Sequence, residues 1–599
     1  MRWSEGGVWS VTVRTSAAAL SDYYYVVMES GLVRRSEWKH HTSEPAELIE
    51  DRWNDCPYEG CRFTRSHSAA LFDRPGFRGA GTAVPVFSLR TDEDFGIGEF
   101  RDLRPLVDWA AATGQSVIQL LPVNDTTRKG EWKDSYPYSP VSAFALHPLY
   151  IRLQEAGVTE DEEFLRLRDS LNVKAEIDYP KVYKAKFALL RKSFTENGEK
   201  DIASAAFRRF CKANAAWLDE YAAFSAGRDG DSPDFWRWIQ WHLDRQFSDE
   251  VRYARSRGVY FKGDLPIGVS ADSADARFHP ELFNLDSTAG APPDFFSADG
   301  QNWGFPTYNW EAMAADGYAW WKARLRKMSE YFDAFRIDHI LGFFRIWEIP
   351  AGCSSGKAGH FNPAIPYTAA EIAASGLPVE GLFLPDPRNE GCFQPCIAPD
   401  TEGLSQEQKE RFGALYDDFF FHRNEALWQR NAEHKLPELL DATGMLACGE
   451  DLGMVPHCVE GVMAHECILS LEMPGMDKGR PWPELAVSAT SSHDMQTLRM
   501  EFASREGRDM EPWEAKRMLQ GCLSASPMLA IFPIQDWLAI DATLRRKNYG
   551  EERINEPADP RHKWRYRLHF NLEALSNAGG FTAEVEGMLK DSSRFNKIQ

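Results

Sequence analysis

The sequence has few cysteines, no long apolar run and no signal-like start. Ten cysteines are scattered through 599 residues, a density far below that of disulfide-held domains, so we expect reduced thiols. Nowhere do 18 or more apolar residues follow one another, and the start, MRWSEGGVWS, lacks the apolar region of a secretory signal. These absences predict a cytoplasmic protein that does not enter a membrane.

Positive charge is also scarce. Lys and Arg number 68 against 89 Asp and Glu, which gives a formal net charge of −21 at pH 7. There is no basic footprint to attract phosphate backbones or anionic lipid, so nucleic acid and membrane surfaces are not expected partners. The pair Cys392 and Cys396 and the His and Cys residues of 457–467 fit no zinc spacing well. We therefore do not expect a metal site.

What the chain has is length and aromatic content. At 599 residues and 43% hydrophobic, it exceeds what one core usually organises, which predicts several structural units or one large barrel with insertions. Aromatic residues make up 13%, including 20 Trp. Indole rings stack on the C–H faces of sugars, although most Trp residues simply pack in cores.

Strand-like apolar runs alternate with amphipathic helical patterns along the chain. Glycines that suit a left-handed helix cap, Gly114, Gly258 and Gly444, precede three of these runs. Eight such runs separated by helices predict an α/β fold of the (β/α)₈ barrel type. The runs lie at 83–89, 116–123, 259–267, 334–340, 445–452, 467–473, 486–494 and 528–536.

Two connections are too long for a minimal barrel. The segments from about 130–257 and 341–443 contain helical patterns of their own, and we interpret them as inserted subdomains at the catalytic face. Before the barrel, 1–40 shows short β-like runs. The expected division is thus a β segment (1–40), a linker (41–80), a catalytic barrel (81–575) and a C-terminal tail (576–599).

Acidic residues end four of the predicted strands. Because barrel active sites lie at the carboxyl ends of the strands, these side chains are the candidates for chemistry. A cluster of carboxylates without a phosphate loop is typical of glycoside cleavage through an oxocarbenium-like transition state. The strand ends carry Asp264; Arg336, Asp338 and His339; Glu450 and Asp451; and His493 and Asp494.

Each of these residues also has a structural explanation. A lone Asp after a strand is often a helix cap, and His339 and His493 could be packed core residues. Arg336 beside Asp338 could be a structural ion pair, or it could orient that carboxylate and keep it ionised. The residues by themselves therefore predict a barrel with an acidic pocket and leave a glycosidase or a lyase open.

At these same residues the chain resembles the amylomaltases, the 4-α-glucanotransferases of glycoside hydrolase family 77, from about residue 80 to 575. The order of all the matching segments together is very specific. They are FSLRTDEDFGIGEFRDL (87–103), IQLLPVNDT (118–126), SYPYSPVSAFALHPLYI (135–151), KGDLPIGVSADSAD (262–275), PPDFFSADGQNWGFPTYNW (292–310), FDAFRIDHILGFFRIWEIP (332–350), GEDLGMVP (449–456), SSHDMQTLR (491–499), and RINEP with WRYRL (553–557 and 564–568).

The resemblance implies a retaining double displacement on α-1,4-glucans, which needs no metal and no organic cofactor. It implies Asp338 as nucleophile, Glu450 as general acid/base and Asp494 as transition-state stabiliser. Maltose, malto-oligosaccharides, glycogen or starch would be substrates, and the product bond would form at a 4-hydroxyl. It further implies substrate-binding roles for Arg336, His339, His493, Tyr138, Trp303, Asp264, Asp294, Gln301 and Asn555.

The separation of Asp338 and Glu450, which is 450 − 338 = 112 residues, is longer than in ordinary amylomaltases. In this the chain resembles the plant cytosolic disproportionating-enzyme branch, whose members carry amino-terminal starch-binding domains. By that resemblance 1–40 is a short β remnant of such a module. Two other functions stay open at this point: an α-glucan hydrolase, which uses the same acids with water as acceptor, and a non-catalytic glucan-binding protein.

Overall fold

The computed structural model describes residues 77–293, 297–476, 478–557, 559 and 561–596, together with Phe72 and the backbone of four short strands near the N-terminus. These four strands form two antiparallel pairs. The strand β1 (Arg2–Ser4) pairs with β2 (Val8–Ser10), and β3 (Asp22–Glu29) pairs with β4 (Leu32–His40).

Eight parallel strands form the centre of the molecule and close on themselves. Their order in the sheet is β18-β12-β7-β6-β5-β21-β20-β19. A parallel bridge between Cys448 and Leu469, with the Gly449 N–H donating to the Leu469 carbonyl at 2.8 Å, joins the two edges. The predicted (β/α)₈ barrel is thereby confirmed. The strands are β5 (Gly79–Val84), β6 (Val117–Leu120), β7 (Tyr260–Leu265), β12 (Ala334–Ile337), β18 (Leu446–Gly449), β19 (Ser470–Glu472), β20 (Ala486–Ser488) and β21 (Leu529–Pro533).

The first barrel strand lies earlier than expected. We predicted it at 83–89, but β5 ends at Val84, and Val86–Ser88 forms a 3₁₀ turn, η1. Pro85 between them has no N–H to donate to a ladder. The strand instead includes Gly81, where a Cβ would lie 2.3 Å from the Val117 carbonyl oxygen. Only glycine allows the two strands to approach this closely.

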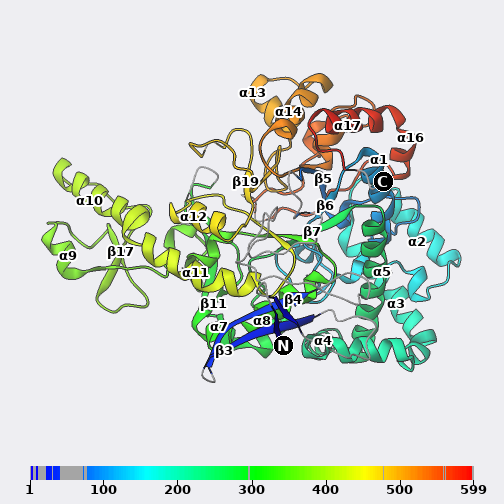
Figure 1. Cartoon of the computed structure of the whole chain (residues 1–599), viewed down its shortest axis with the longest axis horizontal. Coiled ribbons are helices and arrows are strands. Elements are labelled where there is room, and N and C mark those ends of the chain that lie inside the picture. The colour runs from blue at the N-terminus through cyan, green and yellow to red at the C-terminus, as the bar shows by residue number, and fades with distance from the viewer. Residues whose placement is uncertain are drawn as a thin grey trace.

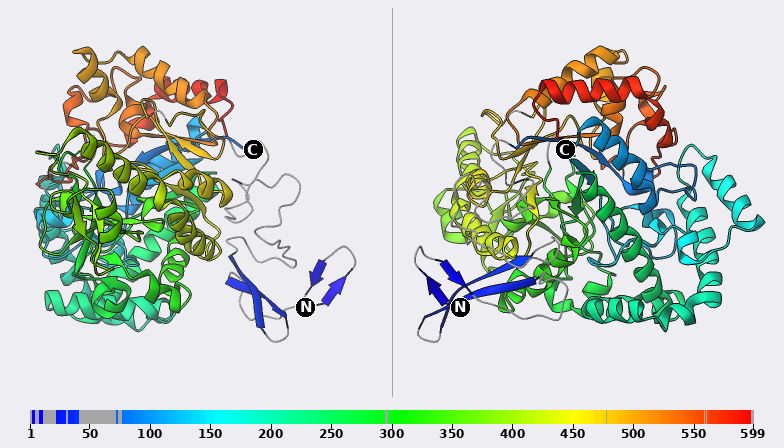
Figure 2. Two further views of the ribbon diagram at one scale, coloured as in Figure 1. Left: turned by 90° about the vertical axis from the view of Figure 1, so that its left-hand side faces the viewer. Right: turned by 45° about the vertical axis from the view of Figure 1, so that its right-hand side comes forward.

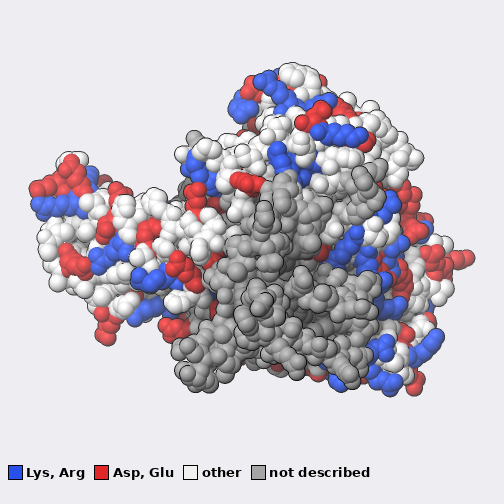
Figure 3. Space-filling view, viewed as in Figure 1, with Lys and Arg blue, Asp and Glu red and all other residues white. Residues whose placement is uncertain are grey.

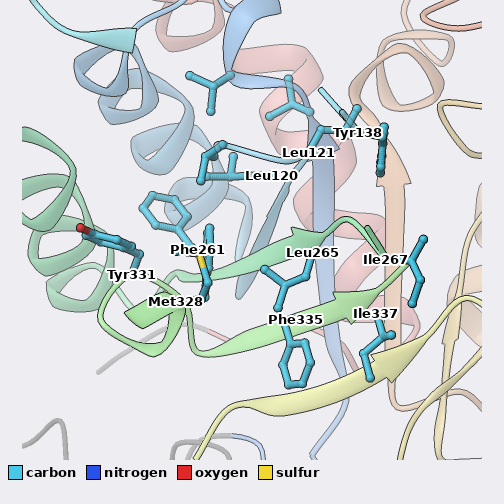
Figure 4. Close-up of a cluster of buried hydrophobic side chains, with 14 of the residues drawn as sticks. Leu120, Leu121, Tyr138, Phe261, Leu265, Ile267, Met328, Tyr331, Phe335 and Ile337 are labelled. Atoms are coloured by element: carbon cyan, nitrogen blue, oxygen red, sulfur yellow. The ribbon is translucent and has the colours of Figure 1, made fainter. Parts of the chain in front are cut away.

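Side chains along the strands alternate between two apolar layers. In β21, Leu529 and Ile531 belong to a cluster inside the barrel, whereas Ala530 and Phe532 belong to the cluster that the helices cover. Phe335 and Ile337 of β12 likewise lie in the outer layer (Figure 4). Inward-facing positions near the carboxyl ends of the strands are polar instead, because there the barrel opens into a cleft.

The helices around the barrel bring the two ends of the catalytic region together. The helix α1 packs against α16 and α17 (Figure 2), and the rings of Trp109 and Phe581 stack with centroids 5.6 Å apart. Buried Arg594 donates to the carbonyl oxygens of Gly79 and Met528. The predicted tail is therefore part of the helical layer. The three helices are α1 (Leu103–Thr113), α16 (Glu573–Asn577) and α17 (Gly579–Asp591).

Two of the three predicted glycine caps are found. Gly114 is the left-handed cap of α1, with φ of 80°, and Gly258 has φ of 73° just after α5 (Pro233–Ser256). The third prediction, Gly444, was wrong. The helix α11 (Glu425–Leu440) ends earlier, at a right-handed cap formed by Asp441. The N–H groups of Ala442 and Thr443 donate to the carbonyls of Leu439 and Leu440, so tight turns satisfy the last carbonyls without a left-handed residue.

The connection from β6 to β7 is mostly helical. In Figure 1 these helices lie on one flank of the barrel. The helix α5 packs against β7, α3 and α4, so it serves as the barrel's own layer and as the base for the added helices. Before α5 this connection contains α2 (Glu162–Asn172), α3 (Tyr179–Ile202) and α4 (Ala205–Asp229).

The connections after β7 and β12 share one small sheet of order β10-β9-β13-β14. It joins the loop that follows Asp264 to the loop that follows Asp338, and so lies over the mouth of the barrel. The strands are β9 (Ser287–Ala291), β10 (Gln301–Asn302), β13 (Ile346–Pro350) and β14 (His360–Asn362). The connection after β7 also contains α6 (Ala274–Phe278), β8 (Phe283–Asn284), β11 (Thr307–Tyr308), α7 (Trp310–Ala315) and α8 (Ala319–Ser329).

The remainder of the connection after β12 projects from the barrel as an arm (Figure 1). On the face shown in Figure 3 the arm carries acidic and basic side chains intermixed, without a patch of one sign. Among the described residues, no helix combines the length and apolar character needed to cross a membrane. The arm contains β15 (Tyr367–Thr368), α9 (Ala369–Ala374), β16 (Phe383–Pro385), β17 (Cys392–Pro395) and α10 (Gln406–Asp418).

The last third of the barrel has shorter connections. Between β18 and β19 lies α12 (Cys458–His465), and between β20 and β21 lie α13 (Leu498–Glu506) and α14 (Pro512–Ser524). The short helix α15 (Ile534–Leu538) follows β21 directly. In Figure 1 α13 and α14 lie together at one edge of the molecule, whereas α12 lies beside α11.

Candidate active site

The carboxylate of Asp338 lies at the end of β12, held by the neighbouring strand. Its backbone N–H donates to the Leu265 carbonyl at 3.2 Å, and the Ile267 N–H lies 3.4 Å from its Oδ2. Arg336 Nη1 donates to Asp338 Oδ1 at 2.9 Å. Burial raises the pKa of Asp338, and the charge of Arg336 opposes that rise.

Arg336 is itself held by a second carboxylate. Its Nη1 donates to Asp264 Oδ1 at 2.8 Å, and Tyr138 donates its hydroxyl to Asp264 Oδ2 at 2.8 Å. Arg336 and Asp264 are directly opposite each other in the ladder of β12 and β7. Strand register therefore positions the guanidinium between Asp264 and Asp338.

Glu450 follows β18 and contacts the backbone next to Asp338. Its Oε2 accepts a hydrogen bond from the His339 N–H at 2.9 Å, and its own N–H donates to the Ile337 carbonyl at 3.0 Å. Removal from water and the nearby charges of Asp338, Asp451 and Asp494 raise the pKa of Glu450 to about 7, against the opposing charge of Arg336. A carboxyl group with this pKa can hold and release a proton near neutral pH.

The backbone at His339 is left-handed, with φ of 45° and ψ of 62°. A non-glycine residue adopts this conformation at an energetic cost, and such residues cluster at functional sites. Here it turns the chain after Asp338 so that the His339 N–H points at Glu450. Burial lowers the pKa of His339 to about 3, so its ring is neutral.

The third acid, Asp494, is held by partners from two segments. Its Oδ2 lies 3.0 Å from His493 Nε2, and its Oδ1 accepts a hydrogen bond from Asn555 Nδ2 at 2.6 Å. Burial opposes ionisation, but the charge of His493 and these hydrogen bonds outweigh it and lower the pKa of Asp494 to about 2. Asp494 is therefore an anion across the physiological range.

Aromatic side chains line the same side of the site. The rings of Tyr138 and His493 stack with centroids 5.1 Å apart, and Trp564 lies 6.0 Å from each of them. Tyr136 lies 5.7 Å from Trp564. Sequence reasoning did not single out Trp564 or Tyr136, although both lie in the segments SYPYSP and WRYRL, and an aromatic residue two positions from Tyr138 was the available signal.

Trp303 and Gln301 come from the loop that connects β9 to β11. Trp303 Nε1 donates to Gln301 Oε1 at 3.0 Å, and the Trp303 ring packs edge-on against His339 with centroids 4.8 Å apart. The Trp303 N–H donates to the Ala289 carbonyl of β9 at 3.0 Å, which anchors the loop. Asp294, predicted as a binding residue in this loop, lies outside the described residues.

These residues surround a cleft of about 770 Å³ at the carboxyl ends of the barrel strands. The predicted residues that line it are Asp338, Glu450, Asp494, Arg336, His339, His493, Tyr138, Trp303, Gln301 and Asn555. Asp264 differs from the prediction. It is 2% exposed, does not line the cleft and has both oxygens engaged by Arg336 and Tyr138, so its position suits orientation of Arg336 and not contact with a sugar.

Two cations in the cleft were not anticipated. Arg345 is 3% exposed, lies 4.0 Å from the Phe361 ring and donates to the Met454 carbonyl. Burial lowers the pKa of Arg345 to about 9. Lys262 of β7 donates to Gln119 Oε1 at 2.6 Å inside the barrel. Neither follows a strand end, so no sequence signal distinguished them.

The described residues contain no group of three or more His, Cys, Asp or Glu side chains arranged to hold a metal ion. The cleft instead combines one carboxyl group that titrates near neutrality with a carboxylate of low pKa and an arginine-paired aspartate. That combination can protonate a leaving group, stabilise positive charge and supply a carboxylate nucleophile.

Known proteins with similar sequences are glucanotransferases. The family model described as 4-alpha-glucanotransferase, glycoside hydrolase family 77, matches residues 84–233 and 227–573. The 4-alpha-glucanotransferase DPE2 of Oryza sativa subsp. japonica is 35% identical over 89% of this chain and 71% of its own length. The 4-alpha-glucanotransferase of Thermus thermophilus is 33% identical over 79% of this chain and 92% of its own.

A solved structure shares the fold. The amylomaltase of Streptococcus agalactiae in complex with acarbose aligns with a TM-score of 0.63 and 20% identity, over 87% of this chain and all of that one. The family match covers the barrel and both walls of the cleft, and the identity to the rice relative extends over most of the chain. The chain therefore belongs to glycoside hydrolase family 77, the 4-alpha-glucanotransferases.

Proposed function

We propose that this 4-alpha-glucanotransferase works by a retaining double displacement in which Asp338 is the nucleophile, Glu450 the general acid/base and Asp494 the stabiliser of the transition state. The observation that carries the assignment is the separation of three pKa environments in one cleft. Glu450 has a pKa of about 7, Asp494 has a pKa of about 2, and Asp338 is paired with Arg336. Groups with such different proton affinities suit different roles.

In the first step Asp338 Oδ2 attacks the anomeric carbon of an α-1,4-linked glucosyl unit. The bond from that carbon to the glycosidic oxygen breaks, and the oxygen takes the proton of Glu450. Arg336 holds Asp338 Oδ1 and so presents the other oxygen. Asp494, an anion held by Asn555, lowers the energy of the positive charge that develops on the sugar ring.

In the second step the ionised Glu450 removes the proton from the 4-hydroxyl of an acceptor sugar. That oxygen attacks the anomeric carbon, the ester bond to Asp338 breaks, and the α configuration is restored. Glu450 is then protonated again, and Asp338 is again a carboxylate. The His339 N–H keeps the Glu450 carboxyl group in place through both steps.

Transfer to a sugar requires that bulk water be kept from the intermediate and that the acceptor be held in place. The small sheet of β9, β10, β13 and β14 supplies covering surface over the cleft, and Trp303 and Trp564, from different loops, supply aromatic faces that line it. These features favour a sugar over water as the acceptor. With water as the acceptor, the enzyme would be a hydrolase.

We further propose that maltose donates one glucosyl unit to a branched glucan such as glycogen and releases glucose. The support is the similarity to DPE2 of Oryza sativa and the long connection between Asp338 and Glu450. The donor and the acceptor would share one cleft of about 770 Å³.

Incubation with maltotriose tests the transfer reaction. Chromatography should show free glucose together with maltotetraose and longer oligosaccharides. The matched control is Asp338→Asn, which should yield neither. Glucose and maltose without any longer product would mean that water is the acceptor, and would contradict the proposal.

Maltose with and without glycogen tests the donor and acceptor preference. We expect glucose release from maltose to rise when glycogen is added, with the transferred units recovered as longer outer chains on the polymer. If glycogen leaves the rate of glucose release unchanged while maltotriose is still disproportionated, the transferase stands and the proposed preference fails.

A further inference from the structure

A second cavity lies on the surface beside α14, apart from the catalytic cleft. Its volume is about 380 Å³, and none of its lining residues lines the cleft. We call it the α14 pocket. The residues that line it are Pro474, Trp482, Phe502, Trp513, Glu514, Arg517, Met518, Gly521 and Cys522.

The wall of the α14 pocket includes an exposed tryptophan. Trp513 is 63% exposed, and it is the one tryptophan among the exposed large apolar side chains of the described residues. Full burial of a large apolar side chain stabilises a folded protein. Trp513 in the first turn of α14 forgoes most of this, so its ring is available to a ligand. Trp482, half-buried in the loop after β19, supplies a second indole.

One face of α14 forms the length of the pocket. Trp513, Arg517 and Gly521 follow one another at intervals of four residues, so they lie on one side of the helix. With a rise of about 1.5 Å per residue, these eight steps span about 12 Å. A Cβ at Gly521 would meet no atom within 4 Å. The pocket is therefore open at this end, and its length suits an oligosaccharide segment.

The pocket combines an apolar floor with a polar rim. Phe502 and Cys522 are buried beneath it. At the rim, Arg508 donates to both oxygens of Glu514, at 2.8 and 2.6 Å. Arg517 is exposed and forms no ion pair within the part of the chain that the structure describes. A pyranose ring presents C–H faces and hydroxyl groups. The indole rings can stack on the C–H faces, and the charged side chains can form hydrogen bonds with the hydroxyl groups.

The loop from β19 to β20 connects this pocket to the catalytic cleft. Pro474 and Trp482 of the loop line the α14 pocket, whereas Met476, two residues after Pro474, lines the cleft together with Leu471. A polymer held at the pocket would thus lie beside the loop that forms one wall of the cleft.

We propose that the α14 pocket is a second binding site for α-1,4-glucan, which holds an outer chain of a polymeric substrate next to the catalytic cleft. This rests on the proposed function only for the identity of the ligand. The site raises the local concentration of chain ends at the cleft, so it acts on polymers and not on maltotriose. Trp513 and Trp482 provide the stacking surfaces, and Arg517 provides hydrogen-bond donors.

Two variants remove the site in different ways. Trp513→Ala deletes the exposed ring, and Gly521→Leu fills the open end of the pocket with an apolar side chain. Gly521→Ala is the matched control, because it raises helix propensity in the same way and adds only the Cβ that meets no other atom. Val173→Ala, at another exposed apolar residue, is the surface control.

Each full-length protein is run through native gels that contain increasing glycogen, and is assayed for maltotriose disproportionation. We expect Trp513→Ala and Gly521→Leu to need at least several-fold more glycogen for half-maximal retardation, with melting temperatures and maltotriose turnover like those of the wild type. Both control variants should be retarded like the wild type.

The outcomes separate this proposal from the proposed function. Unchanged retardation of both pocket variants would overturn the second site. If the pocket variants lose maltotriose turnover as well as glycogen binding, the proposal is also overturned, because the pocket would then be part of the catalytic cleft. If the wild type binds glycogen through the pocket but does not disproportionate maltotriose, the second site stands and the proposed function fails.

Discussion

The carboxylates and the aromatic side chains of the cleft are held by different parts of the backbone. Asp338 and Glu450 directly follow barrel strands, and their backbone N–H groups bond to the neighbouring strands at Leu265 and Ile337. Trp303, by contrast, lies in a loop that is anchored to β9, outside the barrel. Asp338 and Glu450 are therefore fixed by barrel register, and Trp303 by an insertion.

This difference indicates a division of work. A closed barrel allows little movement at its strand ends, so the charges that break and form bonds are preorganised there. Loops and small sheets can change in length and composition without disturbing that geometry. We therefore expect changes at strand ends to act on the chemical step, and changes in the insertions to act on substrate binding.

The largest effect is expected from Asp338→Asn. An amide cannot form the covalent intermediate, so turnover of maltotriose should fall on the order of 10³-fold or more. The melting temperature should stay close to that of the wild type, because Arg336 keeps its bond to Asp264. Turnover like that of the wild type would show that another group is the nucleophile.

Glu450→Gln should be nearly as damaging with maltotriose. Loss of a general acid costs on the order of 10²–10⁴-fold, and the amide oxygen can still accept the His339 N–H. The control is α-glucosyl fluoride, whose leaving group needs no proton, so formation of the intermediate should recover with this donor. If fluoride release is as slow as maltotriose cleavage, Glu450 is not the acid.

A change in the loop tests the other half of the comparison. Trp303→Ala should raise KM and lower kcat/KM by about 10-fold through loss of a stacking surface, with kcat less affected. Trp303→Phe should restore most of the affinity. A large fall in melting temperature instead would assign Trp303 to the core, since its ring also stacks on Phe305 with centroids 5.8 Å apart.

The smallest effect is a shift of the pH profile. Since the pKa of Glu450 is about 7, and its protonated form is the acid, kcat/KM should fall as pH rises above about 7. Asp451, bonded to Lys478 at 2.7 Å, is one of the negative charges that raise the pKa of Glu450. Asp451→Asn removes that charge and should move the alkaline limb to lower pH.

The control for this shift is Glu407→Gln, which changes the same net charge on the exposed arm, in α10. It should leave the limb unchanged. A shift to higher pH in Asp451→Asn, or equal shifts in both variants, would contradict the assignment of the alkaline limb to Glu450.

Most of the barrel could be predicted from the sequence because its signals are local. Buried strands bounded by glycine-capped helices, as at Gly114, are patterns of neighbouring residues. The prediction was wrong at the first strand, where Gly81 is required by close approach to Val117, and at Gly444, because the helix ends in a right-handed turn three residues earlier. The first error arose because a contact distant in sequence, that of Gly81 with Val117, decides which residues form the strand.

The sequence by itself determined which acids end the strands and, through the matching segments, to which family the chain belongs. Only the tertiary structure decided their states. The bond from the His339 N–H to Glu450 joins residues 111 apart, and that from Asn555 to Asp494 joins residues 61 apart. The tertiary structure also placed Asp264 outside the cleft lining, where it binds Arg336. A pKa depends on burial and on charges gathered from distant segments, so no local pattern contains it.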